Sequence, residues 1–160
     1  VLIHGTWVSY IANPIIGPAI LYLRVMKWIS EQQESSLSAI LLDDAYYKAL
    51  LNGKAIENGL SVLRPEYIIL FKAKAYLDLK MRKESGELVD SSDIKKHKKD
   101  ILRIASELIL EKTTGLPKSV ELDIHTFIND LEQEPFDKNL LKIYGLMNDE
   151  VVSLLKQIFM

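Results

Sequence analysis

The chain has 160 residues, of which 48% are hydrophobic and none is cysteine, and its formal net charge at pH 7 is -2. This length allows one globular core, the lack of cysteine excludes disulfides and thiolate metal sites, and the charge gives no global attraction to nucleic acid. A cysteine-free chain is also compatible with the cytoplasmic location that we expect. The histidines His4, His97 and His125 are too scattered to show metal-ligand spacing.

The first segment, 1–34, is apolar but interrupted by proline and glycine. Its unbroken apolar run at 18–23 is far shorter than the roughly 20 residues that span a bilayer, so we expect no membrane partner. The segment also lacks the basic start and the cleavage site of a signal peptide. We interpret it as packing on a missing part of the protein, with a short helix at 19–29. A reading-frame error upstream of Ser35 is the alternative interpretation.

The run LSAILL at 37–42 is a candidate strand, and a short helix follows it. Asp43 or Asp44 can cap this helix, which Asn52-Gly53 ends. Adjacent carboxylates at a helix start point apart, so capping explains this pair better than metal binding does.

The dipeptide Asn58-Gly59 lies between two short apolar runs and predicts a β-hairpin. A long helix follows, because Pro65 suits the first helical position and Glu66 favours the positive end of the helix dipole. Apolar residues then recur at helical spacing, as expected for a buried face. They are Ile68, Ile69, Phe71, Ala75, Tyr76 and Leu79.

Lys72 lies inside this apolar face of the long helix. Burying an ammonium group without a partner is costly, so Lys72 must extend its charge to solvent, pair with a carboxylate, or serve a site. Extension to solvent is the default interpretation, because lysine stems often cover apolar surface, and the other two alternatives stay open. Lys74 has Asp78 one turn further on, and we expect that pair to be solvated.

A second helix is predicted after the charged turn at 83–90, with Ser91 or Ser92 as its cap and an end near Lys112. Cations crowd its polar faces and can hold phosphate groups or the nucleic-acid backbone. A solvated face is the default interpretation, because no aromatic stacking partners are interleaved among them. The cations are Lys95, Lys96, Lys98, Lys99 and Arg103.

Two further side chains of the second helix are candidates for a role. Asp100 has Lys96 and Arg103 one turn away on either side, so its default interpretation is an ion pair on the helix surface. His97 lies on the apolar side of the helix. We interpret it as a packed histidine, because no acid or base partner can be named for it.

The C-terminal part reads as further helices. The first, at 119–131, places its acids on the solvent face, among them Asp123 and Asp130. A short helix at 140–146 is followed by a final helix that Asn148 caps. Because no segment after residue 64 alternates like a strand, we predict a mainly α (α+β) fold, a helical bundle with a small β-hairpin appendage.

The stretch 35–105 resembles the C-terminal half of bacterial nucleotidyltransferase-like proteins related to the AbiEii/AbiGii type IV toxin nucleotidyltransferases. The resemblance rests mainly on PEYIILFKAKA, whose Lys72 matches the family lysine that contacts nucleotide phosphate, and on KKDILRI. In the latter, Asp100 matches the first acid of a late Asp-x-x-Asp element and becomes the candidate catalytic residue. Arg103 replaces the second acid. With Lys72, the residues Lys96, Lys99 and Arg103 form the candidate nucleotide-binding set.

The resemblance implies that the intact family member uses Mg²⁺ and transfers a nucleotide from a nucleoside triphosphate (NTP) to an acceptor such as RNA, and that a cognate antitoxin is a partner. The family's Gly-Ser loop and following Asp-x-Asp pair are missing from this chain. Two-metal phosphoryl transfer needs such carboxylates, so we expect no metal site and no activity from this chain alone.

The simplest account is that residues 35–160 are the helical C-terminal domain of a nucleotidyltransferase-like protein. The exposed apolar face that a missing domain leaves would favour self-association. The alternative is a non-catalytic helical module that binds a protein or nucleic acid.

Overall fold

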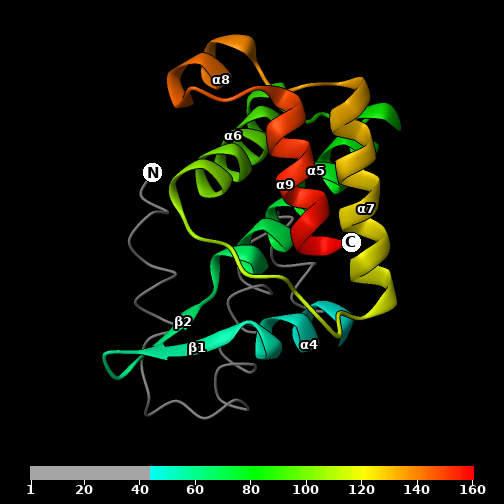
Figure 1. The fold of residues 1–160 in the computed structure, drawn as a ribbon. Helices are drawn as coiled ribbons and strands as arrows, with labels where there is room; N and C mark the ends of the chain where they lie inside the picture. Colours follow the sequence, from blue (N-terminus) through cyan, green and yellow to red (C-terminus); the bar gives the residue numbers. More distant parts are fainter. Residues whose placement is uncertain (1–43) are drawn as a thin grey trace.

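A computed structural model describes residues 44–160 (Figure 1). The segment 1–34, the predicted helix at 19–29, the predicted strand at 37–42 and the capping role of Asp43 lie outside the described residues. The elements, in chain order, are α4 (Asp44–Asn52), β1 (Lys54–Glu57), β2 (Leu60–Leu63), α5 (Pro65–Glu84), α6 (Ser91–Glu107), α7 (Lys118–Gln133), α8 (Lys138–Tyr144) and α9 (Asn148–Phe159).

Four of the helices form a bundle in which α5 contacts α6 and α7, and α9 contacts the same two helices. The short helix α4 lies across the bundle end formed by α5 and α7, and α8 lies beside α6 (Figure 1). The predicted helical bundle with a small β-hairpin is therefore confirmed for the described residues.

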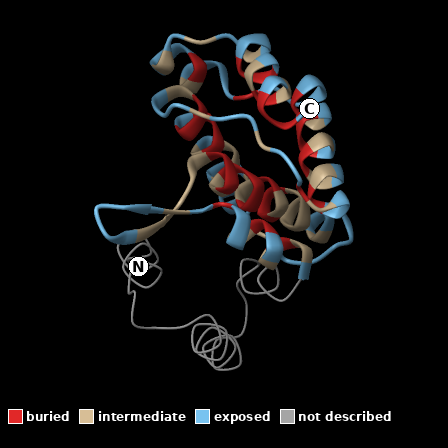
Figure 2. Ribbon diagram, turned by 60° about the horizontal axis from the view of Figure 1, so that its bottom comes forward, coloured by how far each residue is buried: buried red, intermediate tan, exposed pale blue. Residues whose placement is uncertain are grey.

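The core fills the space between the bundle helices, whose inward faces are buried (Figure 2). Its aromatic centre is formed by Tyr76 and Phe127, whose rings meet edge to face with centroids 5.2 Å apart. Such pairs add to the free energy gained from apolar burial alone. The aliphatic side chains with at most 1% of their surface exposed include Ile69, Leu70, Ile101, Leu102, Ile124, Ile128, Leu131 and Leu155.

The hairpin projects from the bundle and leads into α5 (Figure 1). Its strands pair antiparallel, with Ala55 opposite Val62. Asn58 has a φ of 51° and Gly59 a φ of 79°. Positive φ at both central residues is the conformation that Asn-Gly favours, and it matches the twist of the strands. The predicted hairpin and its turn are confirmed.

Three predicted helix ends were wrong. The cap of α6 is Asp90, whose carboxylate accepts a hydrogen bond from the Ser92 backbone N–H at 2.8 Å. Helix α6 ends at Glu107, because the following backbone is extended and pairs with the end of α9 through the Thr113 N–H and the Ile158 carbonyl.

The third wrong end is that of α9, in which Asn148 is the first residue and not the cap. Its side chain instead accepts a hydrogen bond from the Phe136 N–H and donates one to the Leu131 carbonyl. It therefore fixes the turn between α7 and α8 against the start of α9.

Candidate functional site

The face that α5 presents to α6 and α7 carries lysines, and each of them meets an aspartate from a neighbouring helix. Lys72 Nζ lies 2.6 Å from Asp100 Oδ2, which α6 supplies. The exposed fractions of the two side chains are 22% and 14%. Of the alternatives for Lys72, the structure shows the carboxylate pair, and Asp100 pairs across the helix interface rather than with Lys96 or Arg103.

The same arrangement occurs twice between α5 and α7. Lys74 Nζ lies 2.9 Å from Asp123, which also accepts a hydrogen bond from the Tyr46 hydroxyl at 2.9 Å. The expected Lys74–Asp78 pair is thus replaced by an interhelical one. The prediction that Asp123 and Asp130 lie on a solvent face was wrong. Asp123 accepts a hydrogen bond from Tyr46 of α4, and Asp130 accepts one from Tyr76 of α5.

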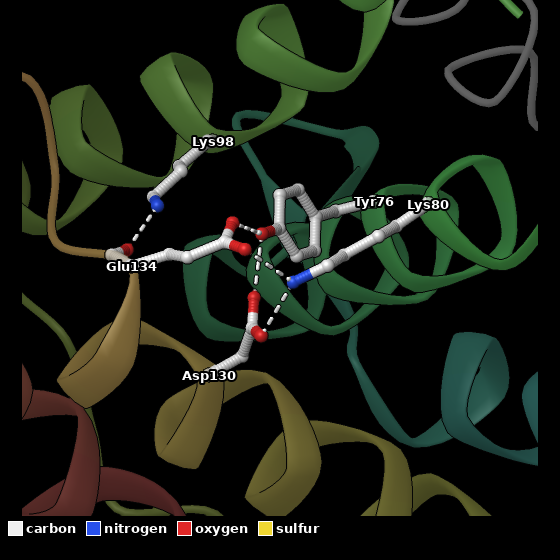
Figure 3. Close-up of polar contacts among 5 residues, drawn as sticks. All are labelled: Tyr76, Lys80, Lys98, Asp130 and Glu134. Atoms are coloured by element: carbon white, nitrogen blue, oxygen red, sulfur yellow. Dashed lines mark hydrogen bonds and ion pairs between the residues drawn. The ribbon is translucent and has the colours of Figure 1, made fainter. Parts of the chain in front are cut away.

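Asp130 stands at the centre of a polar cluster inside the bundle (Figure 3). It accepts hydrogen bonds from the Tyr76 hydroxyl at 2.5 Å and from Lys80 Nζ at 2.6 Å. Glu134 lies 3.1 Å from the same Lys80 ammonium. Burial and the hydrogen bond to Asp130 raise the pKa of Tyr76. Burial lowers the pKa of Lys80, but its bonds to both carboxylates outweigh this and raise it. The phenol is therefore a neutral donor and Lys80 a stable cation.

Lys98 completes the cluster from α6 (Figure 3). Its ammonium group donates to the Glu134 backbone carbonyl and lies 5.8 Å from the Tyr76 ring centroid and 5.6 Å from that of Phe136. Desolvation lowers the pKa of this lysine. Lys98 thus belongs to the interior contacts and not to the exposed cations of α6.

Of the other predicted cations, Lys95 is also exposed, and the three assigned to nucleotide binding, Lys96, Lys99 and Arg103, form a surface that we call the α6 stripe. All of them are exposed. Their spacing places them along one side of the helix, next to Asp100. Within residues 44–160, no carboxylate lies within ion-pair distance of any of them. The stripe is therefore an uncompensated positive surface beside the Lys72–Asp100 pair.

His97 lies one turn before Asp100 on α6, and its Nδ1 atom is buried without a hydrogen-bond partner in the described part of the chain. Desolvation, and next the positive charge of Lys72, lower the pKa of this imidazole to about 4. The ring is neutral at pH 7, as a packed histidine should be.

The same residues bear on whether this part of the chain could hold a magnesium ion. Mg²⁺ prefers several oxygen ligands. Within residues 44–160, no three His, Asp or Glu side chains gather closely enough to hold a metal ion. Asp100 stands alone, and one of its oxygens is bound to Lys72. The described residues therefore do not fit Mg²⁺. Over the same residues, no helix is both long and apolar enough to cross a membrane.

Comparisons of the chain with protein-family models, with curated proteins and with solved structures found no match. A site is therefore indicated by the geometry of the described residues alone. That geometry joins Lys72 to Asp100 and sets the α6 stripe beside them, so every predicted site residue lies on or against α6.

The sequence prediction missed the cluster of Tyr76, Lys80, Asp130 and Glu134. One signal could have revealed it. Asp123 and Asp130 stand about two turns apart on one side of a helix, and the long helix carries Lys74 and Lys80 near the apolar Tyr76 and Leu79. Matching acids to lysines between helices would have proposed these pairs.

Proposed function

We propose that residues 44–160 are the helical part of a nucleotidyltransferase-like protein, in which the α6 stripe holds the phosphates of an NTP for a catalytic domain supplied elsewhere. The observation that carries this proposal is the exposed, uncompensated stripe Lys96, Lys99 and Arg103 beside a half-buried lysine. The resemblance to the AbiEii/AbiGii-related proteins supports the reaction class. A cytoplasmic location and an RNA acceptor belong to the same proposal.

Arginine and lysine suit this task for separate reasons. The guanidinium of Arg103 can hold two phosphate oxygens at once, while Lys96 and Lys99 act as mobile point charges. Because these side chains are exposed, a phosphate reaches them without any rearrangement of the bundle. Their charges also attract the anion from a distance, and this attraction weakens with salt.

Asp100 is assigned a positioning role. It holds the Lys72 ammonium at 2.6 Å, at the edge of the stripe. A phosphate that binds the stripe competes with Asp100 for this ammonium. The Mg²⁺ that accompanies an NTP would depend on carboxylates outside the described residues, because those within them do not form a metal site.

The test is binding of Mg-ATP, Mg-CTP, Mg-GTP and Mg-UTP, measured by isothermal titration calorimetry. The test variant is Lys96→Gln/Lys99→Gln/Arg103→Gln. The matched control is Lys118→Gln/Lys138→Gln/Lys142→Gln, which removes the same charge from exposed positions of other helices.

We expect saturable, salt-sensitive binding that the stripe variant weakens at least about tenfold and the control leaves unchanged. Equal weakening in both variants would show that the NTP is attracted by overall positive charge and not bound by the α6 stripe, which would contradict the proposal. A folded wild-type chain that binds no NTP would contradict the proposal.

A second candidate function is that of a helical interaction module. It is favoured by Leu108 and Ile109, which follow α6 and are 48% and 93% exposed. Adjacent exposed apolar residues are typical of association surfaces. Sedimentation equilibrium of the wild type and of Ile109→Ser tests it. Self-association that the substitution abolishes, together with no NTP binding, would make this the better account.

A further inference from the structure

Asp100 has two neighbours that can compete for its carboxylate. Lys72 reaches it from α5 and makes the 2.6 Å ion pair. His97 stands one turn earlier on α6, where side chains of the same helix face each other. Among the side chains of residues 44–160, only Lys72 makes a hydrogen bond to the Asp100 carboxylate.

The Nδ1 atom of His97 is buried and has no hydrogen-bond partner among the described residues 44–160. A buried polar atom without a partner loses its hydrogen bond to water and gains none in return, so such atoms are rare in stable cores. A neutral ring that carries its hydrogen on Nε2 leaves the Nδ1 lone pair buried and unused. Nδ1 becomes a donor only when it takes up a proton, and it then needs an acceptor nearby. Two carboxylates lie one turn from His97 on α6, the exposed Asp93 and the half-buried Asp100, and Asp100 has the larger electrostatic effect on the ring.

We propose that Asp100 is shared between Lys72 and His97, so that an anion that captures the Lys72 ammonium transfers Asp100 to His97 and is coupled to the uptake of one proton. In this exchange the Lys72 Nζ–Asp100 hydrogen bond breaks and the ammonium binds a phosphate oxygen. His97 takes a proton from water at Nδ1 and donates it in a hydrogen bond to Asp100. The anion's identity as an NTP rests on the proposed function, whereas the exchange itself does not.

The charges around His97 agree with this exchange. Those acting on it are Lys72 from α5 and Asp93, Lys96 and Asp100 from α6, while α8 and α9, which also contact α6, contribute none of these. Lys72 and Lys96 lower the pKa of His97, and Asp93 and Asp100 raise it. When a phosphate neutralises the charge of Lys72, Asp93 and Asp100 still raise the pKa of His97. The pKa of His97 then rises toward its ordinary value of 6.5.

The first arm of the test needs no nucleotide. The pKa of His97 is measured by NMR titration in the wild type, in Lys72→Gln and in Lys96→Gln. Both variants remove one cation that lowers this pKa, but only Lys72→Gln frees Asp100. We expect Lys72→Gln to raise the pKa by at least about one pH unit and clearly more than Lys96→Gln does. Adding Asp100→Asn to Lys72→Gln should remove most of the rise.

The second arm uses calorimetric titration with Mg-ATP at about pH 6, in buffers that differ in ionisation enthalpy. The wild type should take up a proton on binding, and folded His97→Gln should not. Binding without proton uptake, with equal pKa values in Lys72→Gln and Lys96→Gln, would overturn the shared carboxylate and leave the proposed function intact. No nucleotide binding, with the raised pKa in Lys72→Gln, would overturn the proposed function and retain the exchange.

Discussion

The hydroxyl of Tyr76 donates a 2.5 Å hydrogen bond to the carboxylate of Asp130, which ties the middle of α5 to α7 inside the bundle. The phenol ring is buried, with 2% of its surface exposed, so its hydroxyl has no ready access to bulk water. A charged acceptor makes such a bond stronger than one between neutral groups.

Tyr76→Phe should therefore lower the free energy of unfolding by about 1 to 2 kcal/mol, because Asp130 loses one donor while the ring remains. Urea denaturation measures the change. The control is Tyr144→Phe, at a half-buried phenol of α8 that makes no hydrogen bond within the described residues. It should stay within about 0.5 kcal/mol of the wild type. Equal effects of the two substitutions would contradict the role of the Tyr76–Asp130 bond.

The stability should depend on pH through His97. Its pKa is about 4 in the folded chain and 6.5 ordinarily. Between these values the unfolded chain binds more protons, so lowering the pH from about 6.5 to about 4 should reduce the contribution of His97 by about 2 kcal/mol, after discounting for its partial exposure. Above about pH 6.5 the imidazole is neutral in both the folded and the unfolded chain, so the stability no longer depends on pH through His97.

The measurement for His97 is urea denaturation of the wild type and of His97→Gln at about pH 7 and about pH 4.5, which bracket most of this range. The carboxylates are the same in both proteins, so the difference between the two losses of stability on acidification isolates the effect of protonating His97. The wild type should lose more stability on acidification than the variant. A parallel loss in the two proteins would show that His97 is not held neutral.

Gly53 is required for a close approach to Tyr67. A Cβ atom at this position would lie 2.3 Å from Tyr67 Cγ, inside the buried joint between α4 and α5. Gly53→Ala should therefore destabilise the chain by about 2 to 3 kcal/mol through overpacking. Gly115→Ala is the comparison, because its Cβ meets no atom within 4 Å and only its φ of 67° opposes the change. That substitution should cost about 1 kcal/mol. Thermal unfolding measures both variants. A Gly115→Ala variant that unfolds at a lower temperature than Gly53→Ala would contradict tight packing at Gly53.

Asn148 joins two segments through both ends of its amide, accepting from the Phe136 N–H at 3.0 Å and donating to the Leu131 carbonyl at 3.2 Å. Asn148→Asp keeps the acceptor but replaces the donor with a charged oxygen facing a carbonyl. We expect a loss of about 1 to 2 kcal/mol in the free energy of unfolding. Asn139→Asp, at an exposed residue of α8, should change it by less than about 0.5 kcal/mol.

The elements with local signals were predictable from the sequence. Pro65 marked the start of α5, and Asn58-Gly59 marked the hairpin, because each restricts its own backbone. The cap of α6 was assigned to a serine because Asp90, Ser91 and Ser92 can all cap a helix. Only the backbone conformation of Asp90, with a ψ of 124°, decided among them.

The candidate site was predicted in part. Lys72 drew attention because an ammonium stood among apolar neighbours, but its partner Asp100 lies on another helix and was assigned to its own helix neighbours instead. The acids of α7 were placed in solvent for the same reason. Helical periodicity shows which face of a helix is apolar. It does not show that an aspartate on the polar face pairs with a lysine of another helix.

The lysines that α5 carries into the bundle have a consequence for how this sequence can diverge. Each of these lysines pairs with an aspartate of another helix. Lys72 pairs with Asp100 of α6, and Lys74 and Lys80 pair with Asp123 and Asp130 of α7. A substitution of either member removes the opposite charge of a half-buried group, although Lys80 keeps Glu134, and Asp123 and Asp130 keep tyrosine donors. Relatives of this chain should therefore keep or exchange both members of a pair together. These paired positions offer a test of descent that does not depend on overall sequence identity.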